Sequence, residues 1–150
     1  MIQKLYQRLI GVASKFQSPF LLAIRLYWGF QFFQTGQGKL ADIPKVAGYF
    51  GSLGIPFPTL NAYLAAGTEC FGGLLLLMGF ASRLVSIPLA FTMCVAYATA
   101  HRGALVNIFA DPDTFLEQKP FLFLMTALIV LFFGPGIFSV DAIIRKMRKL

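Results

Sequence analysis

A single carboxylate lies in the middle of a long apolar stretch of this 150-residue sequence. Glu69 precedes Gly72-Gly73 and four consecutive leucines. Moving a carboxylate into hydrocarbon costs at least ~2.5–3.5 kcal/mol on insertion scales, so Glu69 must be paired, protonated or functional. Arg25 interrupts an earlier apolar stretch and is the basic side chain that we expect nearest to Glu69 in depth.

Three interpretations of Arg25 and Glu69 stay open at this stage. Their pairing is either a lock between two helices or part of a polar pocket. Such a pocket would hold a proton, a quinone head group or another small polar ligand. The third interpretation is that the long Arg25 side chain extends to the membrane surface and leaves Glu69 protonated.

Lys39 and His101 form a second candidate set, each near the end of an apolar stretch. A basic side chain beside an imidazole suits an anionic or quinone oxygen, and anchoring at the membrane edge is the alternative. The candidate binding residues are therefore Arg25, Glu69, Lys39 and His101. No residue is assigned a catalytic role. No metal site is expected, because the acidic residues that follow His101 show no metal-ligand spacing.

The composition places these residues in a membrane. Hydrophobic residues make up 57% of the chain and charged residues 13%, whereas an ordinary soluble domain carries about 25% charged residues. A net charge of +7 in a soluble protein would suggest nucleic acid. Here the basic residues cluster at the chain ends and in short loops, which is typical of membrane topology. We therefore expect a lipid bilayer as partner and no nucleic acid.

Apolar segments of about 20 residues, the length that crosses a bilayer, recur four times. They predict an all-α, polytopic membrane protein in which residues 1–150 form one membrane domain built on a four-helix bundle. A short interfacial helix is expected at Val46–Phe50, between the first two spans. The expected spans are about 19–38, 59–80, 84–100 and 120–138.

The first sixteen residues place apolar and basic side chains at helical spacing. This pattern predicts an amphipathic helix lying on the membrane surface; a basic flank that only sets topology is the alternative. Four spans put both termini on one side, together with eight basic residues against four on the other. The positive-inside rule then places both termini in the cytoplasm, with the spans in the plasma membrane.

Small residues line one face of each of the first two expected spans. In the second span this face holds Ala62, Ala66, Glu69 and Gly73. In the first span Arg25, Gly29 and Gly36 share a broad face. Small side chains allow helix backbones to approach closely, so these faces are expected to point into the bundle, with Glu69 on a packing surface.

Several short motifs, in this order, resemble those of the DoxX family of small four-helix membrane proteins. The residues that carry the resemblance are Gly36-Gln37-Gly38-Lys39-Leu40, Tyr49-Phe50, Gly54-Ile55-Pro56-Phe57-Pro58, Glu69, Gly72 to Gly79, Arg83, His101, Gly134-Pro135-Gly136, Ser139 and Asp141. The resemblance covers nearly the whole chain. It implies a subunit or partner of membrane redox systems, among them a quinone-reducing oxidase and oxidant-defence assemblies.

We therefore expect an accessory subunit of a redox, quinone-linked or oxidant-defence complex, at most one subunit of an oxidoreductase. The candidate cofactor is a quinone, and no bound haem, flavin or metal is expected. The expected partners are membrane or peripheral redox proteins, with a homo-oligomer as a further option. Two alternatives remain: a non-enzymatic membrane assembly or interaction factor, and a small proton-coupled transporter.

Overall fold

The computed structural model describes residues 2–148, and every regular element within them is a helix. Met1, which opens the expected amphipathic segment, lies outside the described residues, as do Lys149 and Leu150 of the basic tail. The helices are α1 (Ile2–Ala41), α2 (Ile43–Ser52), α3 (Pro58–Met78), α4 (Ser82–Thr99), α5 (Arg102–Val106), α6 (Pro112–Leu116), α7 (Lys119–Phe133) and α8 (Val140–Met147).

Helices α1, α3 and α4 are each long and apolar enough to cross a membrane, and α7 is a shorter apolar helix. The all-helical membrane class is therefore confirmed, and α3 and α4 match the second and third expected spans closely. The helix of the fourth expected span, about 120–138, ends earlier than expected, at Phe133. Gly134 and Gly136 both adopt a φ of 81° around Pro135, a conformation that breaks the helix.

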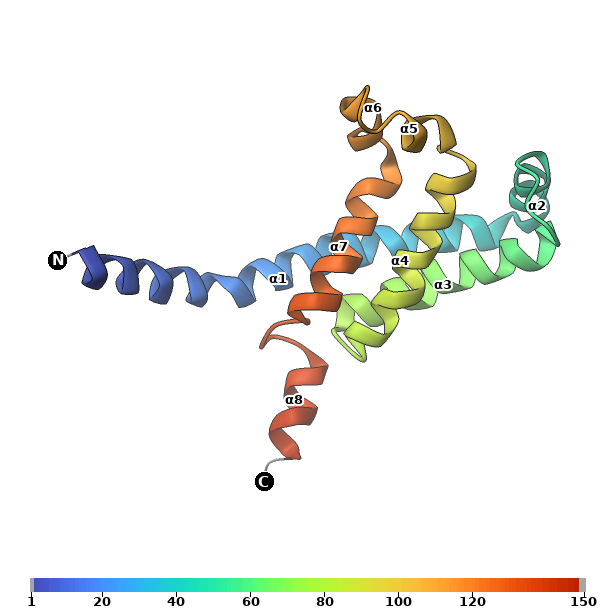
Figure 1. Ribbon diagram of the computed structural model, residues 1–150. Coiled ribbons are helices and arrows are strands. Elements are labelled where there is room, and N and C mark those ends of the chain that lie inside the picture. The colour runs from blue at the N-terminus through green and yellow to red at the C-terminus, as the bar shows by residue number, and fades with distance from the viewer. Residues whose placement is uncertain (1, 149–150) are drawn as a thin grey trace.

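The N-terminal segment is not a separate helix. Residues 2–41, which contain both the expected amphipathic segment and the expected first span, form the single helix α1, with Pro19 inside it. Residues 3–17 are exposed, and this part of α1 extends beyond the other helices (Figure 1).

The long helices pack as two antiparallel pairs, α1 with α3 and α4 with α7 (Figure 1). We call the end of the bundle that holds the turn at residues 79–81 between α3 and α4 the hairpin end. The opposite end, which carries α2, α5 and α6, is the loop end. Helix α8 leaves the bundle at the hairpin end, whereas α2 packs on α3 at the loop end.

Glycines bring α1 and α3 into backbone contact. A β-carbon added at Gly29 would lie 2.9 Å from the Leu77 amide nitrogen, and one added at Gly36 would overlap the Cys70 backbone. Across this contact Ala62, Ala66, Glu69 and Gly73 are buried, as expected of the small-residue face of α3. The predicted close packing of these two faces is confirmed, and it fixes the register between the helices.

The main core lies between the two helix pairs, with Phe32 of α1 and Leu76 of α3 packed against Leu89 of α4 and Val130 of α7. A second cluster lies at the loop end, where Ile43 and Ala47 of α2 cover the start of α3. The short helix expected at Val46–Phe50 thus forms and is longer. It begins three residues earlier because the Asp42 side chain accepts a hydrogen bond from the Lys45 amide and caps it.

Candidate functional site

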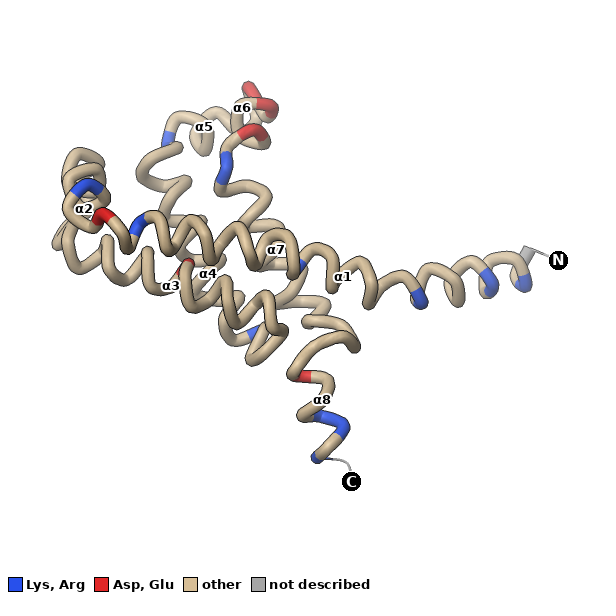
Figure 2. Tube along the Cα trace, turned by 180° about the vertical axis from the view of Figure 1, so that it is seen from behind, with Lys and Arg blue, Asp and Glu red and all other residues tan. Residues whose placement is uncertain are grey.

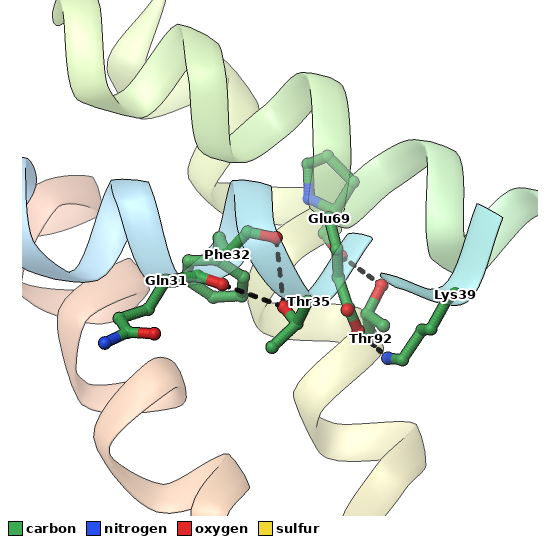
Figure 3. Close-up of polar contacts among 7 residues, drawn as sticks. Gln31, Phe32, Thr35, Lys39, Glu69 and Thr92 are labelled. Atoms are coloured by element: carbon green, nitrogen blue, oxygen red, sulfur yellow. Dashed lines mark hydrogen bonds and ion pairs between the residues drawn. The ribbon is translucent and has the colours of Figure 1, made fainter. Parts of the chain in front are cut away.

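Glu69 pairs with Lys39. The Lys39 ammonium donates to Glu69 Oε1 at 2.5 Å, joining the middle of α3 to the end of α1. The Glu69 side chain is 2% exposed and that of Lys39 is 33% exposed, so the pair links a buried acceptor to a partly accessible cation. Figure 3 shows Thr35 and Thr92 close to this pair. Glu69 Oε2 is buried and has no hydrogen-bond partner within the described chain.

Arg25 does not reach Glu69, so the pairing expected between them does not form. The glycine contacts place Cys70 opposite Gly36, and Glu69 therefore lies beside the last turns of α1. Arg25 is 14 residues before Lys39 on that helix, a rise of about 21 Å. The sequence-based estimate of how deep Arg25 and Glu69 lie in the membrane was wrong, because it counted residues from the end of each predicted span. In the structure α1 and α3 are staggered, and α3 extends past the end of α1 to pack under α2.

Arg25 instead closes the hairpin end. Arg25 is 1% exposed. Its guanidinium donates to the carbonyls of Leu76 (3.2 Å) and Leu77 (3.1 Å) in the last turn of α3, and to that of Phe138 (2.6 Å). A cation at this position satisfies carbonyls that have no partner within the helix and offsets the negative end of the helix dipole.

Two further charged residues act on helix ends in the same region. The Asp141 carboxylate accepts hydrogen bonds from the amides of Ala81 (2.8 Å) and Ser82 (2.9 Å), where α4 begins. Arg83 donates to the Phe132 carbonyl in the last turn of α7. We call Arg25, Arg83 and Asp141 the hairpin-end lock, because each ties a helix terminus to a distant part of the chain.

A cavity of about 870 Å³ opens at the loop end, between the end of α1, α2, the first half of α3 and the second half of α4. Its walls are mostly apolar. Among the polar groups are Lys39 and Glu69, together with His101, which precedes α5, and Lys119, the first residue of α7. This volume and this composition are typical of pockets for small organic ligands, which range over about 300–1,000 Å³.

The cavity brings together three of the four predicted binding residues and excludes the fourth. Lys39, Glu69 and His101 line it, whereas Arg25 lies at the hairpin end. His101 stands at the boundary of α4 and α5, with its ring 6.1 Å from that of Tyr97. Among residues 2–148, no three His, Cys, Asp or Glu side chains gather in a group that would hold a metal ion.

Sequence reasoning missed two threonines of the cavity wall, Thr35 and Thr92. The spacing offered a signal for the first, because Thr35 precedes Lys39 by four residues and therefore shares its helix face. Thr92 gave a weaker signal, since the sequence shows only that it follows Pro88 by four residues. In the structure the Thr92 hydroxyl donates to the Pro88 carbonyl at 2.9 Å. Nothing in the sequence indicated that α4 would face the α1–α3 contact at this height.

The arrangement is suited to holding a polar head group inside an apolar enclosure. Lys39 supplies a cation and spare N–H donors, and Glu69 supplies a carboxylate oxygen that is already desolvated. A ligand with an apolar body and a polar end would satisfy both parts of the wall.

Comparison with known proteins found a matching family and several relatives. The family model described as DoxX matches residues 20–102. A Bacillus subtilis (strain 168) protein named "Putative oxidoreductase CatD" is 29% identical over 128 residues, covering 85% of this chain and 89% of the relative. An uncharacterized membrane protein of Mycobacterium tuberculosis is 29% identical over 143 residues, covering 87% and 83%. No solved structure matches the chain. Because the family model matches more than half of the sequence, the chain is a membrane protein that belongs to the DoxX family.

Proposed function

We propose that the protein is an accessory subunit of a membrane redox or oxidant-defence complex, and that its loop-end cavity holds the head group of a quinone. The observation that carries the proposal is the Lys39–Glu69 ion pair on the wall of an otherwise mostly apolar cavity of about 870 Å³. A quinone ring is apolar on its faces and polar at its two oxygens, so it matches both kinds of wall. The oxidoreductase in the name of the Bacillus relative supports the redox setting.

In this proposal the chain binds and positions the ring, and a partner protein carries out the electron transfer. Lys39 would donate to one quinone oxygen, and the side chains of α2, α3 and α4 would enclose the ring. His101 and Lys119 lie toward the loops at the cavity wall, where they would meet the second oxygen or a polar substituent. We assign no residue a catalytic role.

Filling the cavity tests the proposal. Ala96→Phe places an aromatic ring in the cavity wall, whereas Ala98→Phe, two residues along α4, adds the same ring on the exposed face. We expect the purified Ala96→Phe protein to lose binding of a short-chain benzoquinone in calorimetric titration. The Ala98→Phe protein should bind as the wild type does. Equal binding by both variants would place the ligand elsewhere and refute the proposal.

We further propose that α7 is a fourth span and that both termini lie in the cytoplasm. Helix α7 is about 22 Å long at 1.5 Å per residue. It would be completed at the hairpin end by the apolar residues up to Phe138, with modest local thinning of the bilayer. Basic residues gather along the free part of α1 and on α8, both beyond the hairpin end (Figure 2), and positive charge favours the cytoplasmic face.

The same proposal places α8 at the surface of the plasma membrane, where basic amphipathic helices bind, and the free part of α1 on the cytoplasmic side of it. Reporter fusions test the topology. A fluorescent protein joined after residue 150 should be bright, as it is when folded in the cytoplasm. Alkaline phosphatase inserted at Asn107, in the loop after α5, should be active. A dark fluorescent protein at the C-terminus together with an inactive phosphatase at Asn107 would show the opposite topology and refute the proposal.

The ion pair also bears on the transporter alternative. A proton-coupled carrier needs a carboxylate free to exchange a proton with its substrate, whereas Glu69 is held by Lys39 at 2.5 Å. Absence of pH-driven uptake in proteoliposomes would agree with this argument. A non-enzymatic assembly factor would show a stable partner in pull-down experiments but no quinone binding.

A further inference from the structure

The Glu69 carboxylate on the cavity wall has hydrogen-bond capacity that the described chain does not use. Glu69 Oε1 is engaged by Lys39, but Oε2 is buried and has no partner in the described chain. In the ion pair with Lys39 the side chain of Glu69 is a carboxylate, and the two oxygens of a carboxylate only accept hydrogen bonds. A buried acceptor of this kind is costly unless a donor reaches it.

The neighbouring hydroxyl groups do not supply that donor. Thr35 Oγ1 donates to the carbonyls of Gln31 and Phe32, both at 3.0 Å, and Thr92 Oγ1 donates to the carbonyl of Pro88 (Figure 3). A hydroxyl has one hydrogen to give, so these two side chains offer the cavity only lone pairs. Lys39 has spare N–H groups, but they belong to the same ammonium that already engages Glu69.

We propose that the cavity selects the reduced, hydroquinone form of its ligand over the oxidised quinone. A hydroquinone O–H donates to Glu69 Oε2, and the same oxygen accepts a hydrogen bond from Lys39. A quinone offers acceptors alone and leaves Oε2 without a partner. This inference rests on the proposed function, because it specifies which redox form of the proposed ligand the site prefers.

The expected preference is at least about tenfold, because a hydrogen bond to a charged group is worth more than the ~1.4 kcal/mol that corresponds to a factor of ten. Tighter binding of the reduced form raises the midpoint potential of the bound couple. For a two-electron couple, a tenfold preference corresponds to about 30 mV. The site would therefore retain the reduced form and release the oxidised one.

The test compares both redox forms of one short-chain benzoquinone on the purified full-length protein in lipid nanodiscs, without oxygen. Wild-type protein should bind the hydroquinone at least tenfold more tightly than the quinone. Glu69→Gln keeps an oxygen for Lys39 but turns the free acceptor into an N–H donor, so it should abolish or reverse the preference. Equal affinities in the wild type, tighter binding of the quinone, or an unchanged preference in Glu69→Gln would each overturn the inference.

A ligand-side experiment needs no variant and so does not depend on correct folding of Glu69→Gln. The dimethyl ether of the hydroquinone keeps the ring and both oxygens but has no O–H. It should bind wild-type protein at least tenfold more weakly than the hydroquinone, and equal binding would overturn the inference. If neither redox form binds the wild type, the proposed function itself fails. If both bind without preference, that function stands and only the redox selectivity falls.

Discussion

Replacing Arg25 with methionine should destabilise the bundle without weakening ligand binding. Methionine fills similar space but donates no hydrogen bond. The carbonyl of Leu76 also accepts from the Gly79 amide, whereas Arg25 is the donor that the structure provides to the carbonyls of Leu77 and Phe138. Each buried carbonyl left without a donor costs about 1–3 kcal/mol. The variant no longer buries a cation, which offsets part of this loss, so we expect a net destabilisation of about 2–4 kcal/mol.

The assay is thermal unfolding in detergent, followed by circular dichroism, together with hydroquinone titration of the same samples. The matched control is Arg83→Met, because Arg83 is exposed and makes one hydrogen bond, to the Phe132 carbonyl. Its loss should cost about 1 kcal/mol or less. Arg25→Lys should fall between the two, since one ammonium cannot reach the carbonyls of α3 and Phe138 in the same geometry. Lower affinity at an unchanged melting temperature in Arg25→Met would refute the reasoning and return Arg25 to the binding site.

Three further changes test other parts of the molecule. Gly36→Ala should destabilise by about 1–3 kcal/mol in thermal unfolding, because the new methyl group overlaps the Cys70 backbone, whereas Gly67→Ala meets no atom within 4 Å and should be neutral or stabilising; equal effects would contradict the α1–α3 register. Lys39→Met alone should lower the free energy of unfolding by about 1–3 kcal/mol, a loss that the partial exposure of Lys39 moderates. Lys39→Met combined with Glu69→Leu should lower it by less than the sum of the two single changes, and strict additivity would mean that the ion pair contributes no coupling. Hydrogen bonds from Thr114 lower the pKa of the Asp111 carboxyl in the loop before α6, so the cap that Asp111 forms is present above the ordinary aspartate pKa and is lost as the pH falls through the lowered value. The amide resonance of Thr114 should therefore titrate with a midpoint below pH 3.8, and a midpoint above pH 3.8 would show that the cap is absent.

Much of the fold follows from the sequence because its strongest signals are local. Composition and hydrophobic length predict the helices α3 and α4, which are long and apolar enough to cross a membrane, to within two residues at each end. The small-residue face of α3 follows from a spacing of three and four residues, and the structure buries it as expected. The helix of the fourth span ends at Phe133, earlier than expected, because the backbone turns at Gly134 although the apolar run continues to Phe138. Hydrophobicity indicates whether a segment lies in lipid or in water, whereas the end of a helix depends on the backbone conformation, here on a glycine with positive φ.

Only part of the site was predicted, since its residues were judged one helix at a time. That Glu69 needs a partner follows from the cost of burying its charge. Which cation supplies it depends on the vertical register of α1 against α3, and that register is set by the backbone contacts of Gly29, Gly36 and Gly73. Arg25 and Lys39 lie about four helical turns apart on α1, so a shift of the register by that distance would exchange one partner for the other. The sequence shows Gly29 and Gly36, but it does not show which residues of α3 they meet.

The correction to Arg25 divides the motif residues between two ends of the bundle. At the hairpin end, Arg25 and Asp141 neutralise opposite ends of the dipoles of α3 and α4, and their hydrogen bonds hold the turn between these helices from both sides. At the loop end, Lys39 and Glu69 face a cavity and leave one carboxylate oxygen without a partner. Satisfied charges stabilise one arrangement, whereas an unsatisfied buried acceptor lowers stability and persists only where the rest of the structure enforces it. Glu69 Oε2 is therefore available to a donor that the described part of the chain does not provide.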